Sequence, residues 1–590
     1  MSEAGKTRIV ELDEQTVLYD GSYVPVDDED RGTKKYPIKN LENYVTNSLL
    51  LTQLDGTKTT YDRIMRSWFL GKGINAMTAA GITELCEEWY TAIKDGWEGY
   101  TTFADPDVSA GSTGTKGGDN AGKTCEPSTD SDAGQDDYAG LPLFACTDVN
   151  YVVDETTLDV TITAIDGITD NFTRYDPEKF VGVMQMTGYH FWEEDSTSYT
   201  HGYADHNIGG ANCAPLPEAV RVDGTVREFV VHSKYYFKTV NNKMTSYSGA
   251  IPTAFASHNT IHTLSAATGA QYSGGCVTDW SFLVLMTYIK YASLTLDGIM
   301  QGCCNYNYQL YAQVSETDVR RILIASSDAS KIKVGSSILI GTYNGSSADR
   351  GTAANYNIST NAGAVVTAVE SVTIGSTTYA AVYVDTDSTF NTVANGNAVS
   401  GSTIISTWHW KSGTTDAVFG NDGSPVSNTS GIYPYKLQGI EVMVGGYEIF
   451  TDVILDKVAI SGATYYKPFI VKRTAQQSTS VTANYEGLSD IASACPSAAG
   501  WQYIKKLGFQ DGVFFQQHTG GGSTQYTKDA FYMDAGGTTG TREWLAFGPL
   551  TRGSGYAGLS CLAGDNVLSS AWWACLARLS PNGNRGEWAA

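Results

Sequence analysis

Between Val319 and Trp410 short apolar runs alternate with polar residues, and this stretch constrains the fold more than any other part of the chain. Glycine, asparagine and serine separate the runs, which lie at residues 331–340, 363–374 and 378–384. Alternation of this kind favours strands that bury one face. We therefore predict a small β-barrel or β-sandwich at residues 320–410.

The sequence on either side of this stretch is of mixed character. Strand-like runs occur at residues 158–164, 180–186 and 227–231. One clear helix follows, with Asp279 as its expected N-cap and a broad apolar face that includes Phe282 and Ile289. Together with the β module, these elements predict an α+β, β-rich fold.

The N-terminal quarter divides into three parts. Residues 1–60 alternate short apolar pieces with acidic loops, which indicates an attachment segment rather than a core. Residues 61–104 carry apolar residues at helical spacing and predict two short helices. Residues 105–144 are rich in Gly, Ser, Thr and Asp, which is typical of an exposed loop or linker.

Charge excludes two classes of partner. The 590-residue chain has 39 Lys and Arg against 63 Asp and Glu, a formal net charge of -24. Such a charge repels a phosphate backbone and an anionic lipid surface, so we expect neither nucleic acid binding nor membrane insertion. The longest apolar run, at residues 280–289, is too short to span a bilayer. Residues 1–15 lack the apolar segment of a secretory signal peptide.

The cysteines indicate reduced thiols. Ten cysteines are spread over the chain without a C-x-x-C pair. This pattern favours buried free thiols over a disulfide framework or a zinc site. We predict no metal and no cofactor.

One segment matches a nucleotide-binding spacing. Residues Gly117 to Thr124 (GGDNAGKT) satisfy G-x-x-x-x-G-K-[ST]. A phosphate-binding loop of this type must leave an apolar strand and open a helix, and neither flank has that character. We therefore expect an ordinary glycine-rich turn.

Two further clusters invite a metal or an acid–base role. Asp130, Asp132, Asp136 and Asp137 share one loop, but the glycine and closing glutamate of an EF-hand are misplaced, so a solvated acidic turn is expected. A second cluster places His190, His201 and His206 near acidic residues, at a spacing that fits no helical ligand pair. We interpret these histidines as loop and core residues.

Catalysis has little support in the sequence. No G-x-S-x-G nucleophile elbow occurs. We predict that the protein is not an enzyme and assign no catalytic residue. A modifying oxidase or a glycan-degrading enzyme remains an alternative, which would require reactive cysteines or paired carboxylates in a cleft.

Aromatic residues and glycines are concentrated at the C-terminal end, where the last 90 residues hold five of the twelve tryptophans and fifteen of the 62 glycines. Residues 552–562 (RGSGYAGLSCL), 566–570 and 571–579 (AWWACLARL) resemble the end of C-type-lectin-fold proteins of the formylglycine-generating-enzyme type. They are more similar to the variable ligand-binding region of phage and bacterial proteins diversified by retroelements. Residues 179–190, 274–279, 439–456 and 524–533 resemble the same kind of large phage virion protein.

The resemblance implies a discontinuous C-type-lectin-like domain at residues 145–319 and 411–590, with the β module as an insertion. It also implies a binding face at the positions that vary in the family: Ser554, Tyr556, Ser560, Ala563, Asp565, Ser570, Trp572 and Trp573. Tyrosine, tryptophan and small polar residues suit adaptable recognition. An alternative for the adjacent tryptophans is that they face opposite sides of a strand, with one of them in the core.

The enzyme branch of this resemblance is not favoured, because Cys561 and Cys575 lie fourteen positions apart instead of forming a close redox pair. We therefore expect a bacteriophage tail-fibre or receptor-binding adhesin of the virion that recognises a host-surface polysaccharide or protein. The N-terminal region would contact other virion proteins, and a homotrimer would multiply weak contacts. The main alternative is a purely structural virion component, such as a head fibre, decoration or baseplate protein.

Overall fold

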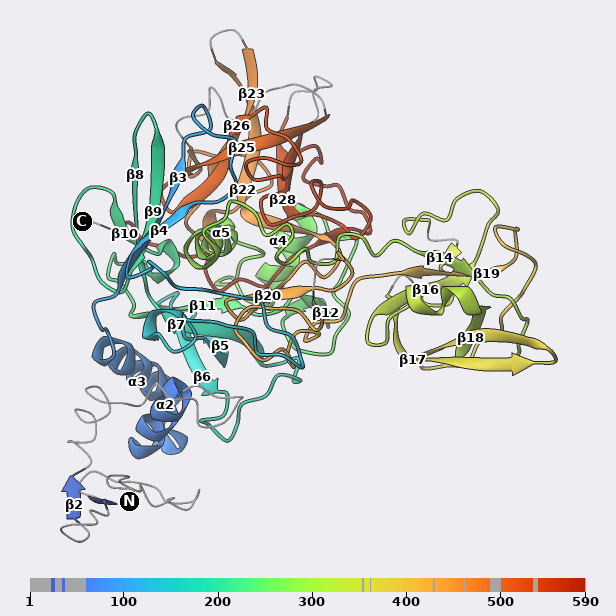
Figure 1. The fold of residues 1–590 in the computed structure, drawn as a ribbon, viewed down its shortest axis with the longest axis horizontal. Helices are drawn as coiled ribbons and strands as arrows, with labels where there is room; N and C mark the ends of the chain where they lie inside the picture. Colours follow the sequence, from blue (N-terminus) through green and yellow to red (C-terminus); the bar gives the residue numbers. More distant parts are fainter. Residues whose placement is uncertain are drawn as a thin grey trace, which may run out of the picture.

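The computed structural model describes residues 23–26, 34–37, 60–352, 355–360, 362–427, 430–460, 463–488, 500–533 and 540–588. Strand residues (34%) outnumber helical residues (14%), which confirms the β-rich α+β class. Figure 1 shows a large body, two helices at one end of it and a separate β lobe at its side. No helix in the described ranges has the length and apolar character that a bilayer crossing requires.

The N-terminal region contributes two strands and two helices. Strands β1 (Tyr23–Val26) and β2 (Lys34–Pro37) form an antiparallel pair. Apart from these two strands and Thr60, the predicted attachment segment at residues 1–60 lies outside the described residues. Helices α2 (Thr60–Gly71) and α3 (Ala79–Ala92) are the two helices that the apolar spacing predicts. Their buried aromatic side chains belong to the main core, so this region is part of the body.

Two antiparallel sheets follow along the chain. The first has the order β10-β8-β9-β3-β4 and the second β11-β7-β5-β6. The first is built from β3 (Glu98–Ala104), β4 (Thr115–Gly118), β8 (Tyr189–Glu194), β9 (Ser198–Ala204) and β10 (Cys213–Pro215). The second is built from β5 (Thr147–Val153), β6 (Val160–Ile165), β7 (Phe180–Met186) and β11 (Phe229–Ser233).

Residues 105–144 are loop-rich, as predicted, but they do not act as a linker. Asn120 and Tyr138 are fully buried. The ammonium of Lys116 donates to the carbonyl of Lys290 at 2.6 Å, and Ser128 Oγ donates to the carbonyl of Asp422 at 2.7 Å. Hydrogen bonds to residues far along the chain fasten this segment to the body, which its polar composition does not reveal.

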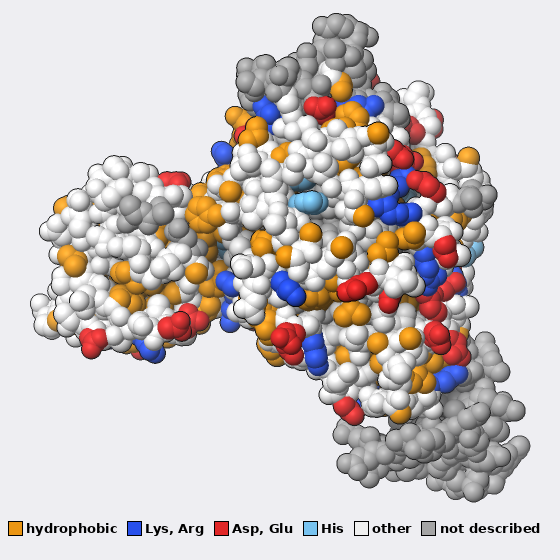
Figure 2. Space-filling model, turned by 180° about the vertical axis from the view of Figure 1, so that it is seen from behind, with side chains coloured by type: hydrophobic (Ala, Val, Ile, Leu, Met, Phe, Trp, Pro, Cys, Tyr) orange, Lys and Arg blue, Asp and Glu red, His pale blue; other side chains and the backbone are white. Residues whose placement is uncertain are grey.

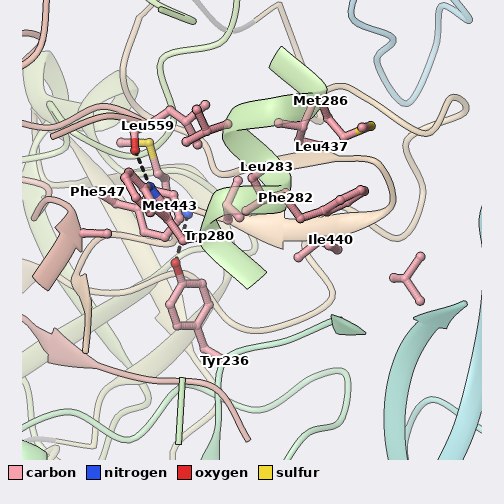
Figure 3. Close-up of a cluster of buried hydrophobic side chains, with 14 of the residues drawn as sticks. Tyr236, Trp280, Phe282, Leu283, Met286, Leu437, Ile440, Met443, Phe547 and Leu559 are labelled. Carbon is pink, nitrogen blue, oxygen red and sulfur yellow. Dashed lines mark hydrogen bonds between the residues drawn. The ribbon is translucent and has the colours of Figure 1, made fainter. Parts of the chain in front are cut away.

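Helix α5 (Val277–Tyr291) forms the centre of the body, with α4 (His258–Thr268) before it. Side chains of α5 pack against β20 (Tyr435–Leu437), β21 (Ile440–Val442) and the C-terminal segment, as the close-up in Figure 3 shows. There Trp280 Nε1 donates to the carbonyl of Leu559 at 2.8 Å. Residues far apart in the sequence therefore share one core.

The predicted N-cap of this helix is wrong. Cys276 occupies the N-cap position and makes no side-chain cap. The carboxylate of Asp452 accepts from the Val277 amide at 2.9 Å, so a residue 175 positions away satisfies the helix end. Asp279 lies in the first turn, where it accepts from Ser580 Oγ at 2.7 Å.

The inserted module is a curled six-stranded sheet with the order β14-β19-β16-β17-β18-β15. Its strands are β14 (Gln309–Tyr311), β15 (Arg321–Ala325), β16 (Ser337–Thr342), β17 (Ala364–Ile374), β18 (Thr377–Val384) and β19 (Thr403–Thr407). Figure 1 shows it as the lobe at the side of the body. It has its own core, which includes Ile324, Ile340 and Ile405, and begins at β14, about ten residues before the predicted boundary.

The C-terminal part forms the largest sheet among the described residues, with the order β24-β23-β22-β28-β29-β27-β25-β26 and with β30 paired to β22. Its strands are β22 (Tyr447–Ile460), β23 (Ala463–Ile470), β24 (Glu486–Gly487), β25 (Gly500–Gln510), β26 (Val513–Thr519), β27 (Ala530–Met533), β28 (Arg542–Phe547), β29 (Leu562–Ala563) and β30 (Cys575–Leu576).

The end of the chain runs through the body, and residues 573–585 are buried throughout. The amide of Phe237 donates to the carbonyl of Ala577 at 2.9 Å, and the Arg578 guanidinium pairs with Glu448 at 3.0 Å. The segments before and after the inserted module therefore form one body.

Candidate functional site

A loop close to the C-terminus, residues 551–560, is held against the large sheet by a buried carboxylate. Asp529 accepts from the Ser560 amide at 2.9 Å. Gly558 lies beside it, and a Cβ atom at this position would be 2.2 Å from Asp529 Oδ1. Close packing thus favours glycine at position 558, and positive φ angles favour it at Gly553 (70°) and at Gly555 (86°) between them.

Four aromatic side chains meet where this loop crosses the sheet. We call Trp501, Tyr503, Tyr532 and Tyr556 the aromatic face. The Trp501 ring lies 5.0 Å from both Tyr532 and Tyr556, and Tyr503 lies 5.8 Å from Tyr556, measured between ring centroids. Each of the four side chains is partly exposed.

Strand pairing explains this arrangement. Trp501 and Tyr503 are two positions apart on β25, so they project to the same side of the sheet. Trp501 is paired with Tyr532 on β27, and directly paired residues of antiparallel strands also share a side. The loop then adds Tyr556 above them.

Arg552 extends the aromatic face toward Trp572. Its exposed guanidinium lies 5.6 Å from the Trp501 ring centroid, a cation–π distance. Arg552 also lies near Tyr447, because its positive charge opposes the rise in the pKa of Tyr447 that burial causes. The Tyr447 ring lies 6.0 Å from Trp572, so the contacts continue from Trp501 to Trp572.

Five of the eight residues predicted to line the binding face are accessible. Ser554 is exposed, and four others are partly exposed: Tyr556, Asp565, Ser570 and Trp572. They lie on the loop after β28 and on the turns around β29 and β30. These residues can contact a partner directly.

The other three require a correction. Ser560, Ala563 and Trp573 are 1%, 3% and 4% exposed. Ser560 bonds Asp529 through its amide, and Ala563 lies in β29 between β27 and β28. Their positions in the sequence suggest a surface loop, but Ala563 lies in the sheet, and Ser560 and Trp573 lie on turns that other segments cover.

The adjacent tryptophans have different roles. They lie on a turn before β30 rather than within a strand, and Trp572 remains partly exposed. The ring of Trp573 contacts Trp408 at 5.9 Å, and the Arg350 guanidinium of the inserted module lies 5.3 Å from it. His409 Nε2 donates to the Trp573 carbonyl at 2.7 Å. Trp573 therefore belongs to the junction with the inserted module. One of the two tryptophans is buried, as the alternative stated, but they do not lie on opposite sides of a strand.

Sequence reasoning missed Trp501, Tyr503, Tyr532 and Arg552 as members of the site. A signal was present in the W-x-Y spacing at residues 501–503, which predicts two aromatic side chains on one face of a strand. The pairing of this strand with β27 cannot be read from spacing.

The segment with the phosphate-loop spacing has another structure. Gly117 and Gly118 end β4, which is antiparallel to β3, and a turn follows instead of a helix. The ammonium of Lys116 donates to the carbonyl of Lys123 at 2.9 Å and closes this turn. The amides are not arranged as a phosphate cradle.

The two clusters considered for metal or acid–base chemistry are structural. Asp136 and Asp137 accept from the amides of Tyr138 and Thr124. His190 Nε2 and His201 Nδ1 lie 2.9 Å apart inside the body, and burial lowers the pKa of both, that of His201 to about 3. The described part of the chain contains no group of three or more His, Cys, Asp or Glu side chains that could hold a metal ion.

An open cavity of about 660 Å³ lies apart from these residues, between loop 123–129 and the end of α5. Lys116 lines it, and burial lowers the pKa of this ammonium to about 8. Lys290 is fully buried in the cavity wall and pairs with Asp422 at 2.9 Å. None of the eight predicted site residues lines this cavity.

No family model matches this chain, and no curated protein sequence matches it.

Proposed function

We propose that the protein is a bacteriophage virion adhesin that binds a host-surface ligand through the aromatic face and its neighbours Arg552, Ser554 and Trp572. The observation that carries the proposal is the ring cluster of Trp501, Tyr532 and Tyr556, which is partly exposed and mounted on a sheet. An exposed aromatic cluster with an arginine has the composition of binding hot spots.

Physical reasoning supports a recognition role for such a cluster. A tryptophan side chain can bury roughly 200 Å², on the order of 5 kcal/mol before the costs of association. Rings that are already in mutual contact lose little conformational freedom on binding. Ser554 and Asp565, at the edge of the cluster, supply small polar groups that can adapt to a partner.

The fold that best accounts for this arrangement is of the C-type-lectin type, interrupted by the inserted module. The accessible positions of the glycine-rich loop and of the turns around β29 and β30 would form the part that varies between related proteins. The N-terminal region would attach the adhesin to the particle, and a homotrimer would present three such faces to one cell.

A binding experiment tests the proposal. The full chain is applied to a panel of intact bacterial strains, and retained protein is quantified by flow cytometry. We expect a Trp501→Ala, Tyr556→Ala double variant to lose binding. Tyr175→Ala is the matched control, because Tyr175 is 70% exposed on the loop between β6 and β7.

Two results would contradict the assignment. Equal binding by the double variant and the control would remove the site. Electron microscopy of particles that places the aromatic face against a neighbouring subunit would favour the structural virion component instead.

A further inference from the structure

The aromatic face carries an exposed cation. Arg552 lies over Trp501, with its guanidinium 5.6 Å from the ring centroid. Two partly exposed lysines lie on neighbouring segments. Lys528 precedes the buried Asp529, and Lys505 follows Tyr503 on β25 at an irregularity in the strand pairing, with its ammonium 5.7 Å from the Tyr526 ring.

Carboxylates offset part of the positive charge near the aromatic face. Asp565 and Arg552 act on the pKa of Tyr447 with opposite signs, so Asp565 opposes the Arg552 charge there. Lys505 approaches Asp107 at 3.9 Å, but Asp107 is 91% exposed, so water screens the pair. Burial raises the pKa of Asp529 to about 7, which reduces its negative charge near neutral pH.

The exposed Arg552 lies on a chain with a net charge of -24. On the side of the molecule in Figure 2, acidic and basic side chains are intermixed. An exposed guanidinium on an aromatic cluster favours a partner that carries a negative group.

We infer that the ligand of the aromatic face is an anionic glycan, in which sugar rings pack on the aromatic side chains while a carboxylate or phosphate group binds Arg552. This inference rests on the proposed function. Aromatic rings have apolar faces that suit the C–H face of a pyranose, and a tyrosine hydroxyl adds a polar edge. A guanidinium binds carboxylate and phosphate with two parallel hydrogen bonds.

A glycan fits better than a nucleic acid. The aromatic face offers neutral rings around one guanidinium, that of Arg552. A nucleic acid would bring a charge at every nucleotide toward a protein of strongly negative net charge.

The test uses defined polymers and the full chain. Binding is measured by biolayer interferometry to immobilised polygalacturonate, lipoteichoic acid and dextran, which carry carboxylates, phosphates and no charge. We expect binding to at least one acidic polymer and none to dextran. Which acidic polymer binds distinguishes the two sources of charge.

Variants then assign the contact. Arg552→Gln should weaken binding to the acidic polymer by about tenfold at about 50 mM salt. Lys243→Gln removes the same charge at an exposed position on β13 (Lys243–Thr245) and should change binding less than about twofold. Raising the salt to about 300 mM should weaken the wild type and narrow its difference from Arg552→Gln.

Cell binding separates this inference from the proposed function. One outcome is that cell binding requires Trp501 and Tyr556 but is insensitive to salt and to Arg552→Gln, or is abolished by protease treatment of the cells. The proposed adhesin function then stands, and the anionic glycan is wrong as its ligand. Equal binding to dextran and the acidic polymers, or binding to none of them, also overturns the glycan. Failure of any cell binding overturns the proposed function itself.

Discussion

The guanidinium of Arg350 lies 5.3 Å from the centre of the Trp573 ring, so a loop of the inserted module packs on the C-terminal segment. Arg350 is buried and makes its hydrogen bonds to Thr407 and Asn307. Trp573 also contacts Trp408, which follows the last strand of the module. The junction of module and body is therefore built on a residue that the sequence places in the binding region.

Replacing the two adjacent tryptophans should have different effects on stability. Trp573→Ala should lower the free energy of unfolding by about 3–5 kcal/mol, because it opens a cavity beside Arg350 and Trp408. Trp572→Ala should lower it by about 1 kcal/mol, because Trp572 is partly exposed. Denaturant titration followed by circular dichroism measures both, and equal losses would contradict the junction role of Trp573.

The close approach of Gly558 to Asp529 should make alanine unfavourable at position 558. The new Cβ would meet the carboxylate, so Gly558→Ala should cost about 1–3 kcal/mol. Gly111→Ala is the control, because a Cβ there meets only Ser109 Oγ at an ordinary distance of 3.4 Å and should change stability by less than about 0.5 kcal/mol. Thermal unfolding of the two variants compares them, and equal melting temperatures would refute the predicted clash.

The buried carboxyl of Asp529 should make stability fall as the pH rises. Burial raises its pKa to about 7 from an ordinary value of 3.8, so between these values the folded state binds more protons than the unfolded state. Its stabilising contribution is thus complete below about pH 4 and lost by about pH 7. The unfolding free energy of Asp529→Asn minus that of the wild type should therefore be larger at pH 8 than at pH 4.

Urea titrations at a series of pH values measure this difference. The asparagine amide oxygen can still accept from the Ser560 amide, so the loop contact is retained. Parallel curves for the wild type and Asp529→Asn across pH 4 to 8 would show that the carboxyl does not titrate in the folded protein.

The histidine pair should act in the opposite direction. Burial lowers the pKa of His201 to about 3 and that of His190 well below 6.5. The folded state therefore binds fewer protons than the unfolded state as the pH falls below about 6.5, and stability is lost toward acid. His190→Gln keeps a neutral hydrogen-bonding group beside His201 and removes one titrating site. The slope of unfolding free energy against pH between 4 and 6 should decrease, and an unchanged slope would argue against a buried pair.

Local patterns predicted the elements more reliably than their ends or partners. The alternation at residues 331–384 predicted a β module, and the module has its own core because apolar residues from several of its strands, among them Ile324, Ile340 and Ile405, pack together. Its first strand, β14, was missed because three residues are too few to show a period. The cap of α5 was missed because Asp452 reaches the helix only through the tertiary fold.

The aromatic face shows the same difference between local pattern and tertiary contact. The sequence alone determined that aromatic residues and glycines gather near the C-terminus, since this follows from composition. The W-x-Y spacing at residues 501–503 was missed as a strand signal. Only the tertiary structure decided that Trp572 is accessible and Trp573 is buried, or that Trp501 meets Tyr556. Burial depends on which distant segments cover a side chain, and neighbours in sequence carry no record of them.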